Sequence, residues 1–205
     1  MLLGSRDKAF DVFLHAGTAV ALAIALPIPR PTRLTVLTLG PAALAGLALE
    51  RPIEERLDRR AVGPAQVAAG LALVMADRAP ARRRRSDAGP RDALLIGLAQ
   101  ACALVPGVSR NGATLTAARL LGFRRDAASR ISREAALPVI AGATALKLVR
   151  LRGKRPQPEH AAGFAAAFAS SLAAARLVPH IDRMRSYAPF GLYRIALGLI
   201  AARSA

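Results

Sequence analysis

The sequence predicts an all-α integral membrane protein, a polytopic helical bundle that includes a re-entrant helix hairpin. Hydrophobic residues make up 53% of the 205 residues and the mean hydropathy is +0.31, yet the formal net charge is +17. The arginines stand mostly in short clusters between apolar runs of about 15 to 20 residues, the length of helix that crosses the hydrocarbon core of a membrane. Such a charge also fits a nucleic-acid binder, but aromatic residues are only 4% and tryptophan is absent, so stacking platforms for bases are missing. We therefore expect a single transmembrane domain over residues 1–205 and no nucleic-acid partner.

The apolar runs are separated by prolines and by basic loops. Pro27, Pro29 and Pro31 end the first run, because proline cannot continue a helix ladder. The loop that holds Arg82 to Arg85 is expected to face anionic lipid headgroups on the cytoplasmic side, where positively charged loops collect. The expected membrane helices cover residues 9–26, 34–49, 62–76, 127–149, 161–178 and 187–202.

Several single residues carry expectations of their own. Cys102 cannot form an internal disulfide and is expected to be a small packing residue. His160, His180 and Tyr187 flank apolar runs and are expected at the membrane interface. Four carboxylates at the end of the second run could bind a metal or exchange protons, but they alternate with arginines, which favours a solvated helix end; they are Glu50, Glu54, Glu55 and Asp58.

One stretch, residues 104–114 with the sequence LVPGVSRNGAT, divides two short apolar runs. Pro106 and Gly107 are expected to stop one helix, and Ser109 is a good N-cap for the next. The flanking runs, 93–105 and 111–123, are too short at 1.5 Å per residue to cross about 30 Å of hydrocarbon. We therefore expect a re-entrant hairpin over about residues 92–123. Its non-helical tip is tolerated only where it is buried in protein or lines a cavity.

This tip is the candidate binding site for an anionic group. A guanidinium inside apolar sequence is costly unless a partner meets it, which makes Arg110 a candidate ligand contact. The N–H groups of the helix that starts at Ser109 would point at an anion, Arg110 could hold two phosphate oxygens, and Asn111 and Thr114 could donate to others. The alternative is a plain helix-turn-helix hairpin with a snorkelling arginine, and the motif alone leaves both open.

Other ionisable residues are weaker candidates for the same chemistry. Asp11 and His15 lie at i and i+4 of one helix face and could hydrogen-bond each other. Glu134 is expected to pair with Arg130, one turn earlier, near the entrance of a helix. Arg194 lies inside an apolar run and is either a snorkelling residue or a second cation that faces the cavity.

The segment GLAQACALVPGVSRNGAT resembles the undecaprenyl-diphosphate phosphatase family of bacterial membrane proteins, also called bacitracin-resistance proteins. The family signature is a Pro-Gly-x-Ser-Arg-Ser-Gly turn after an apolar Gly-x-x-Gln helix. Further segments agree in order with the family, namely FDVFLHAGTAVAL, PAALAGLALERPIEE, LPVIAGATALKL and FGLYRIALGLI. The residues that match the signature are Gly97, Gln100, Pro106, Gly107, Ser109, Arg110 and Gly112.

The resemblance implies an inverted-repeat fold with two re-entrant hairpins in a multi-pass protein of the bacterial plasma membrane. It implies removal of one phosphate from the C55 isoprenoid diphosphate that carries cell-wall precursors. Arg110 would grip the diphosphate with Ser109 beside it as the catalytic pair, and Asn111 stands where the family usually has Ser. A divalent cation, Mg or Ca, is an expected cofactor without identifiable ligands in this chain, and a homodimer is left open. The expected diphosphate-binding residues are Gly107, Asn111, Gly112 and Thr114.

Residues 1–10 depart from the family pattern. Family members begin with another re-entrant hairpin that carries a Glu-rich segment and a Pro-x-Ser-Ser-Thr-Gly-His turn, and MLLGSRDKAF resembles the sequence that follows that turn. One half of the inverted repeat is then incomplete, and we expect a start-truncated reading of a longer gene. The alternative is a binding or transport protein that holds a polyprenyl phosphate without hydrolysing it. Ser109 could attack phosphorus only with a base nearby, and the candidates Asp11, His15 and Glu134 have no motif support.

Overall fold

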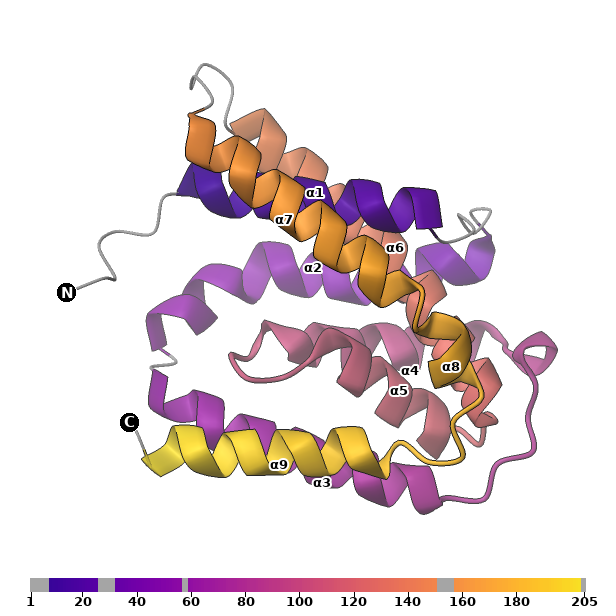
Figure 1. The fold of residues 1–205 in the computed structure, drawn as a ribbon. Helices are drawn as coiled ribbons and strands as arrows, with labels where there is room; N and C mark the ends of the chain where they lie inside the picture. The colour runs from indigo at the N-terminus through magenta and orange to yellow at the C-terminus, as the bar shows by residue number, and fades with distance from the viewer. Residues whose placement is uncertain (1–7, 26–31, 57–58, 151–156, 204–205) are drawn as a thin grey trace. The chain divides into compact units, whose positions relative to one another are not determined.

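The computed structural model describes residues 8–25, 32–56, 59–150 and 157–203, and every regular element within these ranges is a helix (Figure 1). The expected all-α class is therefore confirmed, and the helix positions follow the apolar runs. The longer helices are α1 (Lys8–Ala25), α2 (Arg33–Arg56), α3 (Val62–Arg78), α4 (Pro90–Ala101), α5 (Arg110–Leu120), α6 (Arg125–Arg150), α7 (Pro158–Ala175) and α9 (Ala188–Arg203). The short ones are α8 (Val178–Asp182), η1 (Arg59–Ala61), η2 (Arg85–Asp87) and η3 (Cys102–Leu104).

The chain forms two compact units, so the single domain expected from its length stays a prediction. One unit comprises residues 1–29 and 137–181, and the other comprises residues 30–136 and 182–205. All six predicted site residues belong to the second unit, whereas Asp11 and His15 belong to the first.

In the first unit, α1 and α7 pack with their backbones close together. A Cβ atom on Gly17 would collide with the backbone oxygen of Phe164, so the helices meet at a residue without a side chain. The ring of His160 stacks on Phe13 with centroids 5.1 Å apart, and its Nδ1 accepts a hydrogen bond from the N–H of Gln157 at 3.0 Å. His160 is only 3% exposed, so the expectation of an interfacial position is wrong. It is buried because it caps the start of α7.

In the second unit, the α4–α5 hairpin lies between α2 on one side and the antiparallel pair α3 and α9 on the other (Figure 1). Glycines permit both contacts. A Cβ on Gly97 of α4 would lie 2.5 Å from the backbone oxygen of Thr38 of α2, and one on Gly70 of α3 would lie 2.7 Å from that of Gly191 of α9. Small residues at such crossings allow close helix packing, which is the usual basis of helix association in lipid.

One part of the described chain is a candidate membrane span. The helical stretch Pro158–Asp182 is long and apolar enough to cross a membrane by length and composition, and only 11% of its apolar window is buried. The segments Ala9–Ala25 and Arg33–Leu49 are apolar but shorter. At 1.5 Å per residue, helices of about 17 residues reach roughly 26 Å, less than the roughly 30 Å of a typical hydrocarbon core. The polytopic arrangement and the re-entrant placement of the hairpin therefore stay predictions.

Two helix-end expectations are corrected by the structure. The helix that was expected to end at residue 49 continues through Pro52 to Arg56. The side chains of the carboxylate cluster from Glu50 to Asp58 lie outside the described part of the chain. Cys102, expected to pack inside, is exposed at the start of η3, where the chain leaves α4.

The environment predicted for Tyr187 was also wrong. It was expected at the membrane interface, but its exposed fraction is 0%. Its backbone N–H donates to Oδ2 of Asp77 at 2.8 Å, and its hydroxyl donates to the backbone oxygen of Arg125 at 2.7 Å. These bonds join the start of α9 to the last turn of α3 and to the first residue of α6, and that role requires burial.

The arginine loop before α4 is only partly free to meet lipid headgroups. The guanidinium of Arg83 forms two hydrogen bonds with Asp92, at 2.9 and 2.6 Å, and lies 4.2 Å from the ring centroid of Phe123. Hydrogen bonds from Arg83 lower the pKa of the Asp92 carboxyl below its ordinary value. Arg85 pairs with Glu134 at 2.6 Å. Of the four arginines expected to face lipid, Arg82 and Arg84 are the exposed ones.

Candidate active site

The turn that closes the α4–α5 hairpin requires a glycine. Gly107 has a φ angle of 94°, in the left-handed region that L side chains rarely adopt. A Cβ there would lie 2.5 Å from the backbone oxygen of Val62, the first residue of α3. The N–H of Val108 donates to the carbonyl of Val105 at 3.0 Å and closes the turn. The tip of the hairpin is therefore fixed against α3.

Ser109 caps α5 as the sequence predicted. Its backbone is extended, with φ −81° and ψ 129°, and its Oγ accepts a hydrogen bond from the N–H of Gly112 at 3.2 Å. This bond uses the Gly112 donor, so the N–H groups of Arg110 and Asn111 are the first-turn donors that the cap leaves without an intrahelical carbonyl. The proton of the Ser109 hydroxyl remains free to donate to a ligand.

Arg110 opens α5 directly behind this cap and is half-buried. Its Nη1 is buried and has no hydrogen-bond acceptor among the described residues. A buried donor on a charged group without an acceptor costs on the order of 1 to 3 kcal/mol or more. An anion at the start of α5 would remove that cost, because the guanidinium and the helix N-terminus would both bind it.

A second guanidinium reaches the same turn from α9. Nη2 of Arg194 donates to the carbonyl oxygen of Gly107 at 2.6 Å, and its Nε is buried without an acceptor among the described residues. Within the described chain, neither Arg194 nor Arg110 forms an ion pair. The sequence left two alternatives open for Arg194, a snorkelling residue or a second cation that faces the cavity. In the structure its side chain binds the turn.

Asn111 and Thr114 belong to a buried hydroxyl network that the motif did not reveal. The hydroxyl of Ser132 on α6 donates to Oδ1 of Asn111 at 2.6 Å and lies 2.5 Å from Oγ1 of Thr114. Thr114 also lies within hydrogen-bond distance of the carbonyls of Arg110 and Asn111, at 3.0 and 3.1 Å. The hydroxyl proton of Thr114 is therefore donated within the protein and is not available to a ligand. Asn111 is exposed, and because its oxygen is occupied, its Nδ2 donors are left for a ligand.

Ser132 and Gln100 are the polar residues that sequence reasoning did not assign to the site. Ser132 is 18 positions from Thr114 and fully buried, and no local pattern links the two. Gln100 belongs to the last turn of α4 and is 3% exposed, and both polar atoms of its amide lack a partner in the described chain. Gln100 is one of the residues that match the family signature, and this match was the signal available in the sequence.

Of the candidate bases, Glu134 lies in the same unit as Ser109, and its carboxylate is already held by arginines. Glu134 pairs with Arg85 at 2.6 Å and, as expected, with Arg130 at 3.1 Å. His15 is exposed on α1. The side chain of Ser109 accepts its cap hydrogen bond from the N–H of Gly112.

The donor set at the turn does not fit a resident divalent cation. In the described part of the chain, no group of three or more His, Cys, Asp or Glu side chains lies close enough to hold a metal ion. The turn offers a hydroxyl, an amide and backbone groups beside two guanidiniums, which repel a cation, whereas Mg and Ca prefer carboxylate oxygens. The described residues do fit an anion.

A family model and two named relatives indicate the same protein family. The family model described as bacitracin resistance protein BacA matches residues 30–200. The undecaprenyl-diphosphatase of Geobacter sulfurreducens is 40% identical over 227 residues, which cover 96% of this chain and 84% of that protein. The undecaprenyl-diphosphatase of Anaeromyxobacter dehalogenans is 52% identical over 167 residues, covering 70% of this chain and 57% of that protein. The match to the family model includes the turn, Arg110 and Arg194. The chain belongs to the bacitracin resistance protein BacA family.

Proposed function

We propose that this protein is an undecaprenyl-diphosphatase, a membrane hydrolase that removes the terminal phosphate of undecaprenyl diphosphate and leaves undecaprenyl phosphate for cell-wall synthesis. The relatives named above carry this activity in their names, and the first of them is matched over 84% of its length. The observation on which the proposal rests is the buried Nη1 of Arg110 at a capped helix start, which has no acceptor in the described part of the chain.

The substrate chemistry matches the donors at the turn. A diphosphate offers several anionic oxygens, and in-line hydrolysis transfers negative charge to the bridging oxygen as the bond from phosphorus to it breaks. Arg110 would hold two oxygens of the diphosphate, and the N–H groups of the first turn would bind a third. The amide of Asn111 and the hydroxyl of Ser109 would donate to the remaining oxygens. Water supplies the oxygen of the released phosphate, and the departing group is the lipid monophosphate.

A location in the bacterial plasma membrane with several crossings is part of the proposal. Besides the stretch Pro158–Asp182, other helices expose large apolar side chains, as expected where lipid is the solvent. On α2, Leu44 and Leu47 are 69% and 77% exposed, and on α9, Leu192 and Ile200 are 59% and 61% exposed. In this arrangement the hairpin would be re-entrant, because α4 and α5 are too short to cross and return side by side.

The direct test measures phosphate released from undecaprenyl diphosphate by the purified protein in detergent. Wild-type protein should release phosphate, and Arg110→Ala should reduce the rate by at least about a hundredfold, the usual cost of a donor to developing charge. Arg91→Ala is the matched control, since Arg91 is an exposed arginine at the open end of the hairpin. Activity that survives Arg110→Ala would reject the assigned role. Tight binding of the lipid without any release would instead indicate a non-catalytic polyprenyl-phosphate carrier.

A further inference from the structure

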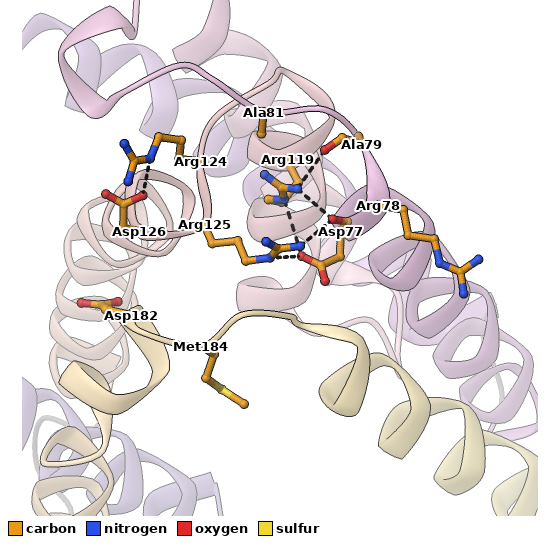
Figure 2. A pocket seen from close by; sticks show the side chains of 10 residues that line it. All are labelled: Asp77, Arg78, Ala79, Ala81, Arg119, Arg124, Arg125, Asp126, Asp182 and Met184. Carbon is orange, nitrogen blue, oxygen red and sulfur yellow. Dashed lines mark hydrogen bonds and ion pairs between the residues drawn. The ribbon is translucent and has the colours of Figure 1, made fainter.

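A separate cavity lies at the opposite end of α5 from the turn. Its volume is about 550 Å³, and Arg119, which contributes to its wall, comes nine residues after Arg110. At 1.5 Å per residue the two arginines are about 14 Å apart along the helix axis. The cavity is therefore distinct from the candidate active site. Its lining includes four arginines, three aspartates and Met184 (Figure 2).

One wall of the cavity has more guanidinium groups than carboxylates. Arg125 and Arg119 both approach Oδ1 of Asp77 through Nε, at 2.6 and 3.6 Å, and Figure 2 shows both side chains directed toward it. Asp77 and Arg119 are each only 3% exposed. The buried guanidinium of Arg119 also donates to the backbone carbonyls of Phe123, Asp77 and Ala79, whereas the side chain of Arg125 is 33% exposed. Because the two guanidiniums share one carboxylate, they leave a net charge of about +1, part of which faces the cavity at Arg125.

The other acidic residues of the lining do not neutralise this excess. Asp182 already forms a two-point ion pair with Arg133, at 2.6 and 2.9 Å. Asp126 meets Arg124 at 3.3 Å, and the two side chains are 60% and 53% exposed, so this surface pair is weak and easily opened. Arg78 is exposed and forms no ion pair within the described chain. The lining therefore keeps a positive surplus.

We propose that this cavity binds a phosphate group, carried by the headgroup of an anionic phospholipid. Phosphate oxygens would replace Asp126 at Arg124 and would contact Arg78 and the outer part of Arg125, because a guanidinium binds two phosphate oxygens at once. Apolar side chains near the cavity favour a lipid over a soluble anion. Met184 lines it, and Met75, which lies on the same face of α3 one turn before Arg78, is 70% exposed.

Arg82 and Arg84 of the arginine loop are also exposed, but they do not line this cavity. That difference supplies the matched control. The double variant Arg78→Gln, Arg124→Gln removes two charges from the cavity, and Arg82→Gln, Arg84→Gln removes two exposed charges from the loop. All four side chains are exposed, so both variants are expected to fold, which circular dichroism and thermal unfolding would verify.

The experiment titrates the full chain in detergent with phosphatidylglycerol, with phosphatidylcholine and with inorganic phosphate, and counts bound molecules by native mass spectrometry. The wild type should retain phosphatidylglycerol in preference to phosphatidylcholine. The cavity variant should bind it about tenfold more weakly, the scale of losing charge-assisted hydrogen bonds, and the loop variant less than about twofold. If inorganic phosphate binds and shows the same dependence on the cavity variant while phosphatidylglycerol does not, the site takes a soluble phosphate. Equal losses in the two double variants, or no loss in either, would overturn the proposal.

Discussion

Gly107→Ala offers the sharpest test of how the hairpin turn is built. The native φ of 94° is unfavourable for alanine, and the new methyl group would lie 2.5 Å from the oxygen and 3.0 Å from the Cα of Val62. Both of these atoms belong to the backbone at the start of α3, so they cannot rotate away as a flexible side chain would. The turn must move, and its carbonyl then leaves the guanidinium of Arg194, which holds it at 2.6 Å in the native protein.

The expected loss of stability in Gly107→Ala is the sum of two costs. An L residue held in a left-handed conformation costs about 1 to 3 kcal/mol, and forcing an extra carbon into a packed position costs a similar amount. We therefore expect the free energy of unfolding to fall by about 3 to 4 kcal/mol, more than a hundredfold in the ratio of folded to unfolded protein. Phosphate release should fall further than stability accounts for, because the displaced turn also carries Ser109 and Arg110.

Gly112→Ala is the matched control on the same motif. A Cβ at Gly112 would lie 3.4 Å from Cβ of Ser109, and the residue has a helical backbone in the first turn of α5. Alanine favours a helix over glycine by up to about 1 kcal/mol, so this variant should unfold at the same temperature as the wild type or slightly higher. The measurements are thermal unfolding in detergent and the rate of phosphate release. If Gly107→Ala and Gly112→Ala behave alike, the reasoning about the turn is wrong.

Three further experiments test the rest of the site and its support. Arg194→Gln should lower kcat/KM at least about tenfold while Arg194→Lys restores little, since lysine lacks the planar fork that holds a carbonyl and an anion together; equal activity of all three proteins would argue against a positioning role. A double-mutant cycle of Ser132→Ala and Asn111→Ala, read as KM for the lipid, should show coupling of about 1 kcal/mol, and additive effects would mean that their 2.6 Å hydrogen bond does not orient the amide. Hydrogen bonds from Arg83 lower the pKa of Asp92, so their stabilisation is complete above the unfolded pKa of about 3.9 and is lost as the pH falls through the folded value. Thermal unfolding between pH 7 and pH 3 should therefore show a smaller acid-induced loss for Asp92→Asn than for the wild type.

Local features of the sequence were sufficient to predict the helices and the turn between α4 and α5. Apolar runs bounded by proline and arginine gave the helix positions, because burial and backbone hydrogen bonding depend on neighbours close in the chain. Ser109 was predicted as a cap for the same reason, and the structure shows its bond to Gly112. Proline was a weaker guide, since α2 continues through Pro52. The expected end at residue 49 followed the end of the apolar run, and it was wrong because the helix continues into the charged residues beyond it.

Burial of single polar residues could not be predicted in the same way. Tyr187 and His160 looked interfacial because each stands at the end of an apolar run, yet both are buried and hydrogen-bonded. Cys102 looked internal and is exposed. The sequence reports which residues are apolar but not which partner a polar side chain will meet, and that partner decides whether its burial is tolerable.

The candidate site also combines local features, which the sequence predicted, with long-range contacts, which it did not. The sequence by itself determined that a guanidinium at position 110 follows a proline-glycine turn and a serine cap, because all three lie within five residues. Only the tertiary structure decided that Arg194 binds the turn, that Ser132 occupies the oxygen of Asn111 and that Ser132 also contacts Thr114. These contacts join residues 18 to 87 positions apart. Their existence depends on how α5 packs with α6 and α9, and no local pattern records that packing.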